Sequence, residues 1–332
     1  MKQTLINRGF ILALVTIALY SCKKEPEPVW VDKTETVPSV NYTSPKDFNK
    51  KMLPAPQQFA IDASKKVTIT TSSGSNFTFD PGSFYNTSGY INSGNIDIKI
   101  TEVNKTSEMI ATGAGTEAIK GILASAGMFK IEASQSGKPI NLDMNKPISV
   151  QIPAGPNATV DGFKLFKGTE NPSEDKVVWD EAEQDSSTGF DSLRLEKIGS
   201  KNIFTFKMNF LNWCNLDQYY NYKQGTAESI KVSVTGDYGN LNTEIYLYFT
   251  TTGGAKGAVR MYSDQTNKQW NTSGYKLPLN DKFKIIATAI NINTKQLEYQ
   301  ILNITHETGK VHNFDRMTPI SETDLEAIMK TL

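Results

Sequence analysis

The residues best suited to hold a ligand stand close together in the stretch Trp213-Cys214-Asn215-Leu216-Asp217. In an extended strand, alternate side chains point to the same side, so Trp213, Asn215 and Asp217 would share one face. The polar pair could supply oxygen ligands to Ca²⁺ or hold sugar hydroxyls beneath the indole. Alternatively, the indole packs at a domain junction and the polar pair bonds to loop backbone. The sequence favours this structural interpretation.

Three tyrosines, Tyr219, Tyr220 and Tyr222, follow this motif and form the densest aromatic cluster of the chain. Exposed tyrosines can stack on sugar rings or anchor protein interfaces. Tyrosines in ordinary β-sandwiches also pack without any ligand, and this second role is the one that we expect. Cys214 is expected to be a small buried hydrophobic residue.

The histidines and glycines offer weaker candidate sites. The two histidines, His306 and His312, could form a metal site together with Glu307 or Asp315. We interpret both histidines instead as polar residues at the edge of a strand and its loop. No G-x-S-x-G nucleophile motif occurs, and Gly113-Ala114-Gly115 lacks the rest of a dinucleotide-binding loop. We therefore expect no bound metal, no cofactor and no enzymatic activity.

The elements that must position these residues are strands. Apolar and polar residues alternate within residues 96–101, 148–152, 204–210, 230–234 and 245–249, and clusters of Gly, Ser, Thr and Asn separate these runs. This pattern predicts a mostly β fold of antiparallel sheets stacked in sandwiches. Near the end of the chain, Ser321 and Asp324 resemble a capping box that precedes apolar residues at helical spacing. One short C-terminal helix is expected there.

The first 21 residues have the features of a targeting segment. Lys2 and Arg8 precede an uncharged stretch, Gly9–Tyr20, which is shorter than the roughly 20 apolar residues that cross a bilayer. Leu19-Tyr20-Ser21-Cys22 then resembles the lipobox of bacterial lipoproteins, with the bulkier Tyr20 as a departure from the usual pattern. The resemblance implies cleavage before Cys22, attachment of lipid to its thiol, and anchoring in a membrane through that lipid.

The segment after Cys22 is rich in proline and charge, and residues 22–58 are predicted to form an extended tether. Its start, Lys23–Pro28, resembles the surface-export signal of Bacteroidota lipoproteins, which favours an outer-membrane location facing the cell exterior. Without Lys2 and Arg8, 33 basic residues remain against 35 acidic ones. The resulting slightly negative charge gives no reason to expect nucleic acid as a partner.

Residues 67–153 resemble a ZU5-type β-sandwich of Bacteroidota surface lipoproteins. The matching segments are Phe79–Phe84, Ser93–Ile98, Ser125–Ile131, Gly137–Ile140 and Lys146–Pro153. The W-x-N-x-D pattern at residues 213–217 is similar to a signature of the same lipoproteins, although its cysteine is displaced. We predict two tandem β-sandwich domains, Ig-like or ZU5-like: a ZU5-like domain with trailing strands over residues 59–205, and a second domain over residues 206–332 that ends in the helix. Self-cleavage, known for some ZU5 proteins, is not implied because their His-Phe-Ser triplet is absent.

These features together predict a non-enzymatic surface lipoprotein whose body binds a glycan, a peptide or an envelope protein, or has a structural role. Asp191-Ser192-Leu193 resembles the Bacteroidota O-glycosylation motif, which makes Ser192 a candidate modification site. A second interpretation stays open. Scattered carboxylates such as Asp217 and Asp237 could converge in a deep cleft and act in an envelope hydrolase.

Overall fold

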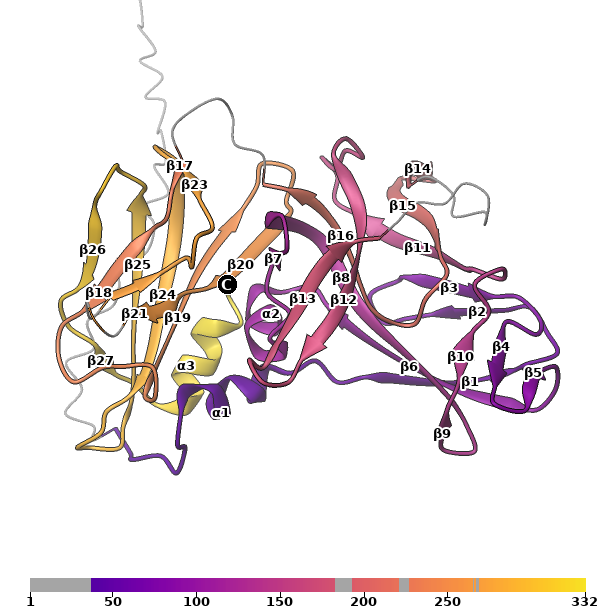
Figure 1. Ribbon diagram of the computed structural model, residues 1–332, viewed down its shortest axis with the longest axis horizontal. Helices are drawn as coiled ribbons and strands as arrows, with labels where there is room; N and C mark the ends of the chain where they lie inside the picture. The colour runs from indigo at the N-terminus through magenta and orange to yellow at the C-terminus, as the bar shows by residue number, and fades with distance from the viewer. Residues whose placement is uncertain (1–36, 183–192, 221–226, 265, 267–268) are drawn as a thin grey trace, which may run out of the picture. The chain divides into compact units, whose positions relative to one another are not determined.

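The computed structural model describes residues 37–182, 193–220, 227–264, 266 and 269–332 (Figure 1). The described residues form several β-sheets and three short α-helices, α1 (Pro45–Asn49), α2 (Thr106–Thr112) and α3 (Glu322–Met329). The predicted mostly β fold of the sandwich class with a short C-terminal helix is confirmed. No helix in this part of the chain is both long and apolar enough to cross a membrane.

Two sheets contain most of the strands. The larger sheet has 13 strands: β1 (Gln57–Asp62), β6 (Asn95–Val103), β7 (Glu117–Ala118), β8 (Gly121–Gln135), β9 (Lys138–Pro139), β12 (Phe163–Asn171), β13 (Lys176–Glu181), β16 (Asn212–Tyr219), β19 (Thr243–Thr250), β20 (Lys256–Arg260), β24 (Lys282–Ile290), β25 (Leu297–Thr305) and β27 (Thr318–Pro319). The second sheet has five strands in the order β14 (Arg194–Ile198), β15 (Lys201–Met208), β11 (Ile148–Ala154), β3 (Asn76–Phe79) and β2 (Val67–Thr70).

Three smaller sheets complete the fold. They are formed by β10 (Asn141–Leu142), β4 (Phe84–Asn86) and β5 (Gly89–Ile91); by β17 (Ala227–Glu228) and β23 (Leu277–Pro278); and by β21 (Tyr262–Asp264), β22 (Gln269–Asn271), β18 (Lys231–Val234) and β26 (Val311–Phe314). In the last of these, β18 and β26 run parallel, and the other pairings of that sheet are antiparallel.

The longest strand, β8, is paired along both of its edges. It runs antiparallel to β6 on one side and to β16 on the other, and single residue pairs or short ladders add β7, β9 and β20. The β8–β16 ladder contains a bulge, since Leu216 pairs with Gly127 whereas Asp217 pairs with Ser125. Ala126 is therefore the extra residue, and the bulge bends the strand locally.

The two larger sheets close around an apolar core. Ile96, Ile98 and Ile100 of β6 are fully buried while the alternating Asp97 and Lys99 are exposed, as the sequence pattern predicted. Between the sheets, the Phe129 ring of β8 lies 5.0 Å from Phe77 of β3 and 6.5 Å from Phe206 of β15, measured between ring centroids. These aromatic contacts join the two layers of the sandwich.

The described part of the predicted tether was assigned wrongly. Within residues 37–58 lie α1, a 3-10 turn (Lys50–Met52) and the start of β1, and Val40, Phe48 and Met52 are buried in a core cluster. Their few apolar side chains are enough to dock the segment, although prolines and charges surround them in the sequence. Residues 22–36 and the lipobox lie outside the described residues.

The division into two sandwich domains stays a prediction. The strand β15 runs through residues 205 and 206, where the boundary was placed, and β16 beyond it pairs with β8 and β12. By its internal contacts, Val37–Leu332 forms one compact unit.

Candidate functional site

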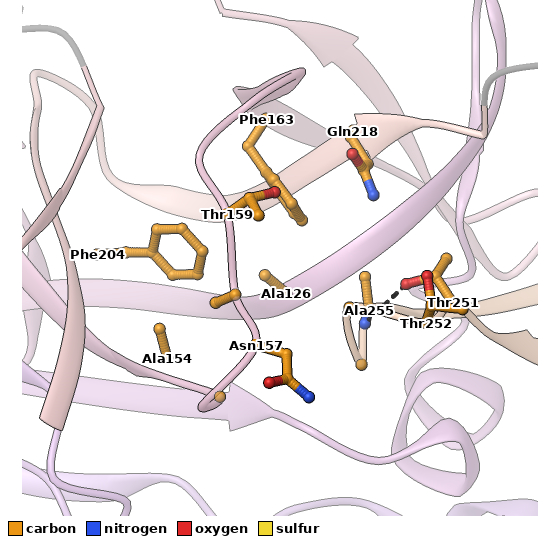
Figure 2. Close-up of a pocket in the computed structure, with 14 residues that line it drawn as sticks. Ala126, Ala154, Asn157, Thr159, Phe163, Phe204, Gln218, Thr251, Thr252 and Ala255 are labelled. Carbon is orange, nitrogen blue, oxygen red and sulfur yellow. Dashed lines mark hydrogen bonds between the residues drawn. The ribbon is translucent and has the colours of Figure 1, made fainter.

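A cleft of about 490 Å³ opens over the bulge of β8 (Figure 2). Its lining comes from β8, β12, β15 and β16, from the end of β11 and the loop that follows it, and from the turn between β19 and β20. The 14 lining residues are Ala126, Ala154, Gly155, Asn157, Ala158, Thr159, Phe163, Phe204, Gln218, Thr251, Thr252, Gly253, Gly254 and Ala255. None of these side chains is charged, so the described part of the lining contains no carboxylate, imidazole or amine that could act as a general acid or base.

Two side-chain amides of the cleft are free to bind a ligand. Gln218 is half-buried at the end of β16, and Figure 2 shows it pointing into the cleft. Asn157 is exposed in the loop after β11. Within the described residues, neither amide has a hydrogen-bond partner. Each amide can both donate and accept, which suits a ligand with hydroxyl groups.

The two walls of the cleft differ in character. On one side the Phe163 ring packs against the buried Phe204 ring, with their centroids 5.6 Å apart. On the other side the turn after β19 is held by hydrogen bonds. The Thr251 amide donates to the Ala255 carbonyl at 2.8 Å, and the Ala255 amide donates to Thr251 Oγ1 at 3.1 Å. The cleft therefore has an apolar wall and a fixed polar wall.

Trp213, the aromatic residue of the W-x-N-x-D motif, is a packing residue. Its ring lies edge-on to Trp179 at 6.3 Å, and its Nε1 donates to Glu170 at 2.9 Å. Gly168 of β12 pairs with Trp213 on one side and with Trp179 on the other. Because Gly168 has no side chain, the two indoles meet above it. This agrees with the structural interpretation of Trp213.

The polar residues of the motif form a buried hydrogen-bond chain at the bulge. The Gly127 amide donates to Ser125 Oγ at 3.1 Å, Ser125 Oγ donates to Asn215 Oδ1 at 2.7 Å, and Asn215 Nδ2 donates to Asp217 Oδ2 at 2.6 Å. Asn215 and Asp217 are both 0% exposed. They bond to each other and to Ser125 rather than to loop backbone, and a ligand from solvent cannot reach them.

Burial raises the pKa of two acidic side chains at this motif, Asp217 and Cys214. Desolvation raises the pKa of the Asp217 carboxyl well above its usual value, although the neighbouring Ser125 and Asn215 side chains act to lower it. Asp217 Oδ1 has no partner among the described groups. Burial likewise raises the pKa of the neighbouring Cys214 thiol. Cys214 is fully buried, so its predicted role as a small hydrophobic residue is confirmed.

The tyrosines after the motif are largely packing residues. Tyr219 is half-buried against Phe166, with ring centroids 5.5 Å apart. Tyr220 packs on Phe249 at 4.4 Å, and its hydroxyl donates to Asp281 at 2.8 Å. Tyr222 and the candidate glycosylation site Ser192 lie outside the described residues.

His306 is buried directly after β25, and His312 is buried within β26. His306 Nδ1 lies 2.9 Å from the Pro278 carbonyl, and His312 Nε2 has no partner among the described groups. Burial lowers the pKa of His312, and nearby Lys310 and His306 add to this effect. Across the described ranges, no three His, Cys, Asp or Glu side chains gather in a way that could hold a metal ion.

The carboxylates suggested for a hydrolase differ in their surroundings. Asp217 is buried at the bulge, whereas Asp237 is exposed in the connection between β18 and β19, and neither lines the cleft. Glu117 of β7, which is 7% exposed, is a further buried carboxylate. Burial raises its pKa to about 7, although Lys176 and Arg260 lie close enough to oppose the shift.

The sequence interpretation missed most residues of the cleft. Gln218 directly follows the W-x-N-x-D motif, and Gly253-Gly254 was recognised only as a turn. No local pattern distinguishes Ala126, Asn157 or Phe163, because the cleft forms only when distant strands meet. The bulge residue Ala126 in particular sits within an otherwise regular strand pattern.

Replacing Gly168 tests the packing of the tryptophan pair. An added Cβ would lie 2.6 Å from the Trp213 Cβ and 2.7 Å from Trp179 Cζ3. Gly168→Ala should therefore destabilise the protein by about 1–3 kcal/mol in urea unfolding. Gly239→Ala is the matched control because nothing lies within 4 Å of its added Cβ, and a change within about 0.5 kcal/mol is expected. Equal effects of the two substitutions would contradict this packing.

Replacing Glu117 tests its buried protonated state. An acid whose pKa rises from 4.5 to about 7 on folding binds its proton more tightly in the folded state. Its contribution is fully present below pH 4.5 and falls by about 3 kcal/mol as the pH rises to 7. Glu117→Gln should remove this fall, so that the variant gains stability relative to the wild type between pH 4.5 and 8. Parallel pH profiles in chemical unfolding would show that Glu117 ionises normally.

Comparison with known proteins adds no family assignment. No protein-family model matches this chain, and no curated protein matches its sequence.

Proposed function

We propose that this chain is a lipoprotein of a Bacteroidota outer membrane, anchored through Cys22 and facing the cell exterior. Its β-sandwich body, which resembles ZU5-type domains, binds a ligand in the cleft over the bulge of β8 and catalyses no reaction. The ligand is a glycan, a peptide or a segment of an envelope protein. The basis of the anchor is the sequence Leu19-Tyr20-Ser21-Cys22.

The observation that carries the binding role is the pair of free amides in an uncharged cleft. The half-buried Gln218 and the exposed Asn157 both line a space of about 490 Å³, and neither amide has an internal partner among the described residues. A half-buried polar group that is left without a protein partner retains its capacity to bind a ligand. Ligand sites of this size typically combine apolar walls with a few polar groups.

Removal of the lipidated cysteine tests the anchor. Cys22→Ala has no thiol for the thioether bond, so the protein should leave the membrane fraction of cells that express it. The measurement is the distribution of the protein between membrane and soluble fractions. Ser21→Ala keeps a small residue before the cysteine and should stay in the membrane. Retention of Cys22→Ala in the membrane would contradict lipid anchoring at this residue.

Blocking the cleft tests the binding role. The full lipidated protein in detergent is screened against immobilised glycans, peptides and envelope proteins. Asn157→Trp places a large side chain at the cleft from an exposed loop and should abolish capture of whatever ligand the wild type binds. Asn240→Trp introduces the same side chain at an exposed loop position outside the cleft lining and should preserve capture. Capture unaffected by Asn157→Trp, or none at all, would refute binding in this cleft.

A further inference from the structure

The lack of charged side chains in the described lining of the cleft restricts the class of ligand that it can hold. Although 21% of the residues in the chain are charged, none of the 14 lining residues is. A carboxylate, phosphate or ammonium group that enters the cleft would lose hydration without gaining a charged partner from the lining. This loss costs free energy unless an opposite charge compensates it. The lining therefore disfavours acidic glycans, phosphorylated groups and charged peptide side chains.

The polar groups of the cleft match hydroxyl groups. Besides the amides of Gln218 and Asn157, the hydroxyls of Thr159 and Thr252 line the cleft. None of these four polar side chains has a hydrogen-bond partner within the described ranges. Amides and hydroxyls each donate and accept hydrogen bonds, as do the hydroxyls of a sugar. In Figure 2, Gln218 and Thr159 lie above Ala126, while Asn157 lies below it with its amide directed downward, away from Gln218.

The apolar groups are arranged as one wall rather than as a deep pocket. Phe163 is half-buried and rests against the buried Phe204, and Ala126 and Ala158 add methyl groups to the lining. A pyranose ring has one face of C–H groups and a rim of hydroxyls. That face can pack on an aromatic ring while the rim bonds to surrounding polar groups.

The strands around the cleft leave little for a peptide backbone to bind. Ala126 belongs to β8, and on the edge of β8 away from β16, Ser125 pairs with Lys256 of β20 and Met128 pairs with Val103 of β6, which leaves only Ala126 and Gly127 between them. Gln218 belongs to β16, which is paired with β8 and β12. Addition of a peptide strand needs several unpaired residues along one strand edge, and these two strands do not present such an edge at the cleft.

We propose that the cleft binds an uncharged sugar residue of a glycan, with the C–H face of the pyranose against Phe163 and its hydroxyls bonded to Gln218 and Asn157. This inference rests on the proposed binding function and names the ligand class of the same site. The experiment must therefore separate a wrong ligand class from a cleft that binds nothing.

The test measures equilibrium binding of the full lipidated protein in detergent to three kinds of probe. These are neutral oligosaccharides of glucose, mannose or xylose, oligogalacturonates as acidic counterparts, and uncharged peptides. At least one neutral series should bind, and the acidic and peptide probes should not. Gln218→Ala should weaken that binding about tenfold through loss of one buried hydrogen-bonding group. Gln218→Glu should weaken it further, because it adds a charge without a partner.

Two further variants separate local from general effects. Phe163→Leu keeps an apolar side chain but removes the aromatic face, and it should weaken neutral-sugar binding while urea unfolding shows that the fold persists. The double variant Tyr85→Ala/Tyr90→Ala removes an exposed aromatic pair outside the cleft lining and should bind as the wild type does. Sugar binding that depends on the tyrosines and not on Gln218 would overturn the inference.

The remaining outcomes are also decisive. Binding of peptides or oligogalacturonates that Asn157→Trp abolishes would preserve the binding function and refute the neutral-sugar assignment. Absence of binding to every probe and to the wider panel of glycans, peptides and proteins would refute both.

Discussion

The pairing of β8 along both edges is the constraint on which the rest of the structure depends. Its ladder with β6 carries the alternating isoleucines into the sandwich core, and its ladder with β16 brings Trp213, Asn215 and Asp217 into the same sheet. A strand bonded on both sides cannot shift its register without exposing its apolar face. The bulge at Ala126 is therefore fixed in place, and the cleft forms above it.

The buried hydrogen-bond chain explains why polar residues occupy such a central position. A bulge leaves backbone groups without their regular ladder partners, and here Ser125 Oγ accepts the hydrogen bond of the Gly127 amide. Asn215 and Asp217 extend this chain from the opposing strand. The consequence is a carboxyl whose pKa is raised by burial. The polar side chains of the motif therefore stabilise the bulge. The amide that is open to a ligand belongs to the next residue, Gln218.

Local patterns predicted the strands, the buried cysteine and the C-terminal helix, because alternation and capping are properties of neighbouring residues. Ser321 does accept a hydrogen bond from the Asp324 amide, and Leu325 and Met329 are buried as the helical spacing required. The docking of Val40 and Phe48 could not be predicted, since it depends on partners far away in the chain. The cleft escaped prediction for the same reason: Phe163, Asn157 and Gln218 meet only after the strands have paired.

In the proposed function, the sheet displays a small uncharged cleft at the cell surface, and the lipid at Cys22 holds the body near its ligand. The central structural claim is that the β8–β16 ladder fixes this cleft. Native-state hydrogen exchange of the full chain tests it most directly. The amides of residues 123–131 and 212–219 should exchange only through global unfolding, more slowly than those of the peripheral strand β14. Exchange of the β8–β16 amides through local opening, at rates like those of β14, would contradict the account.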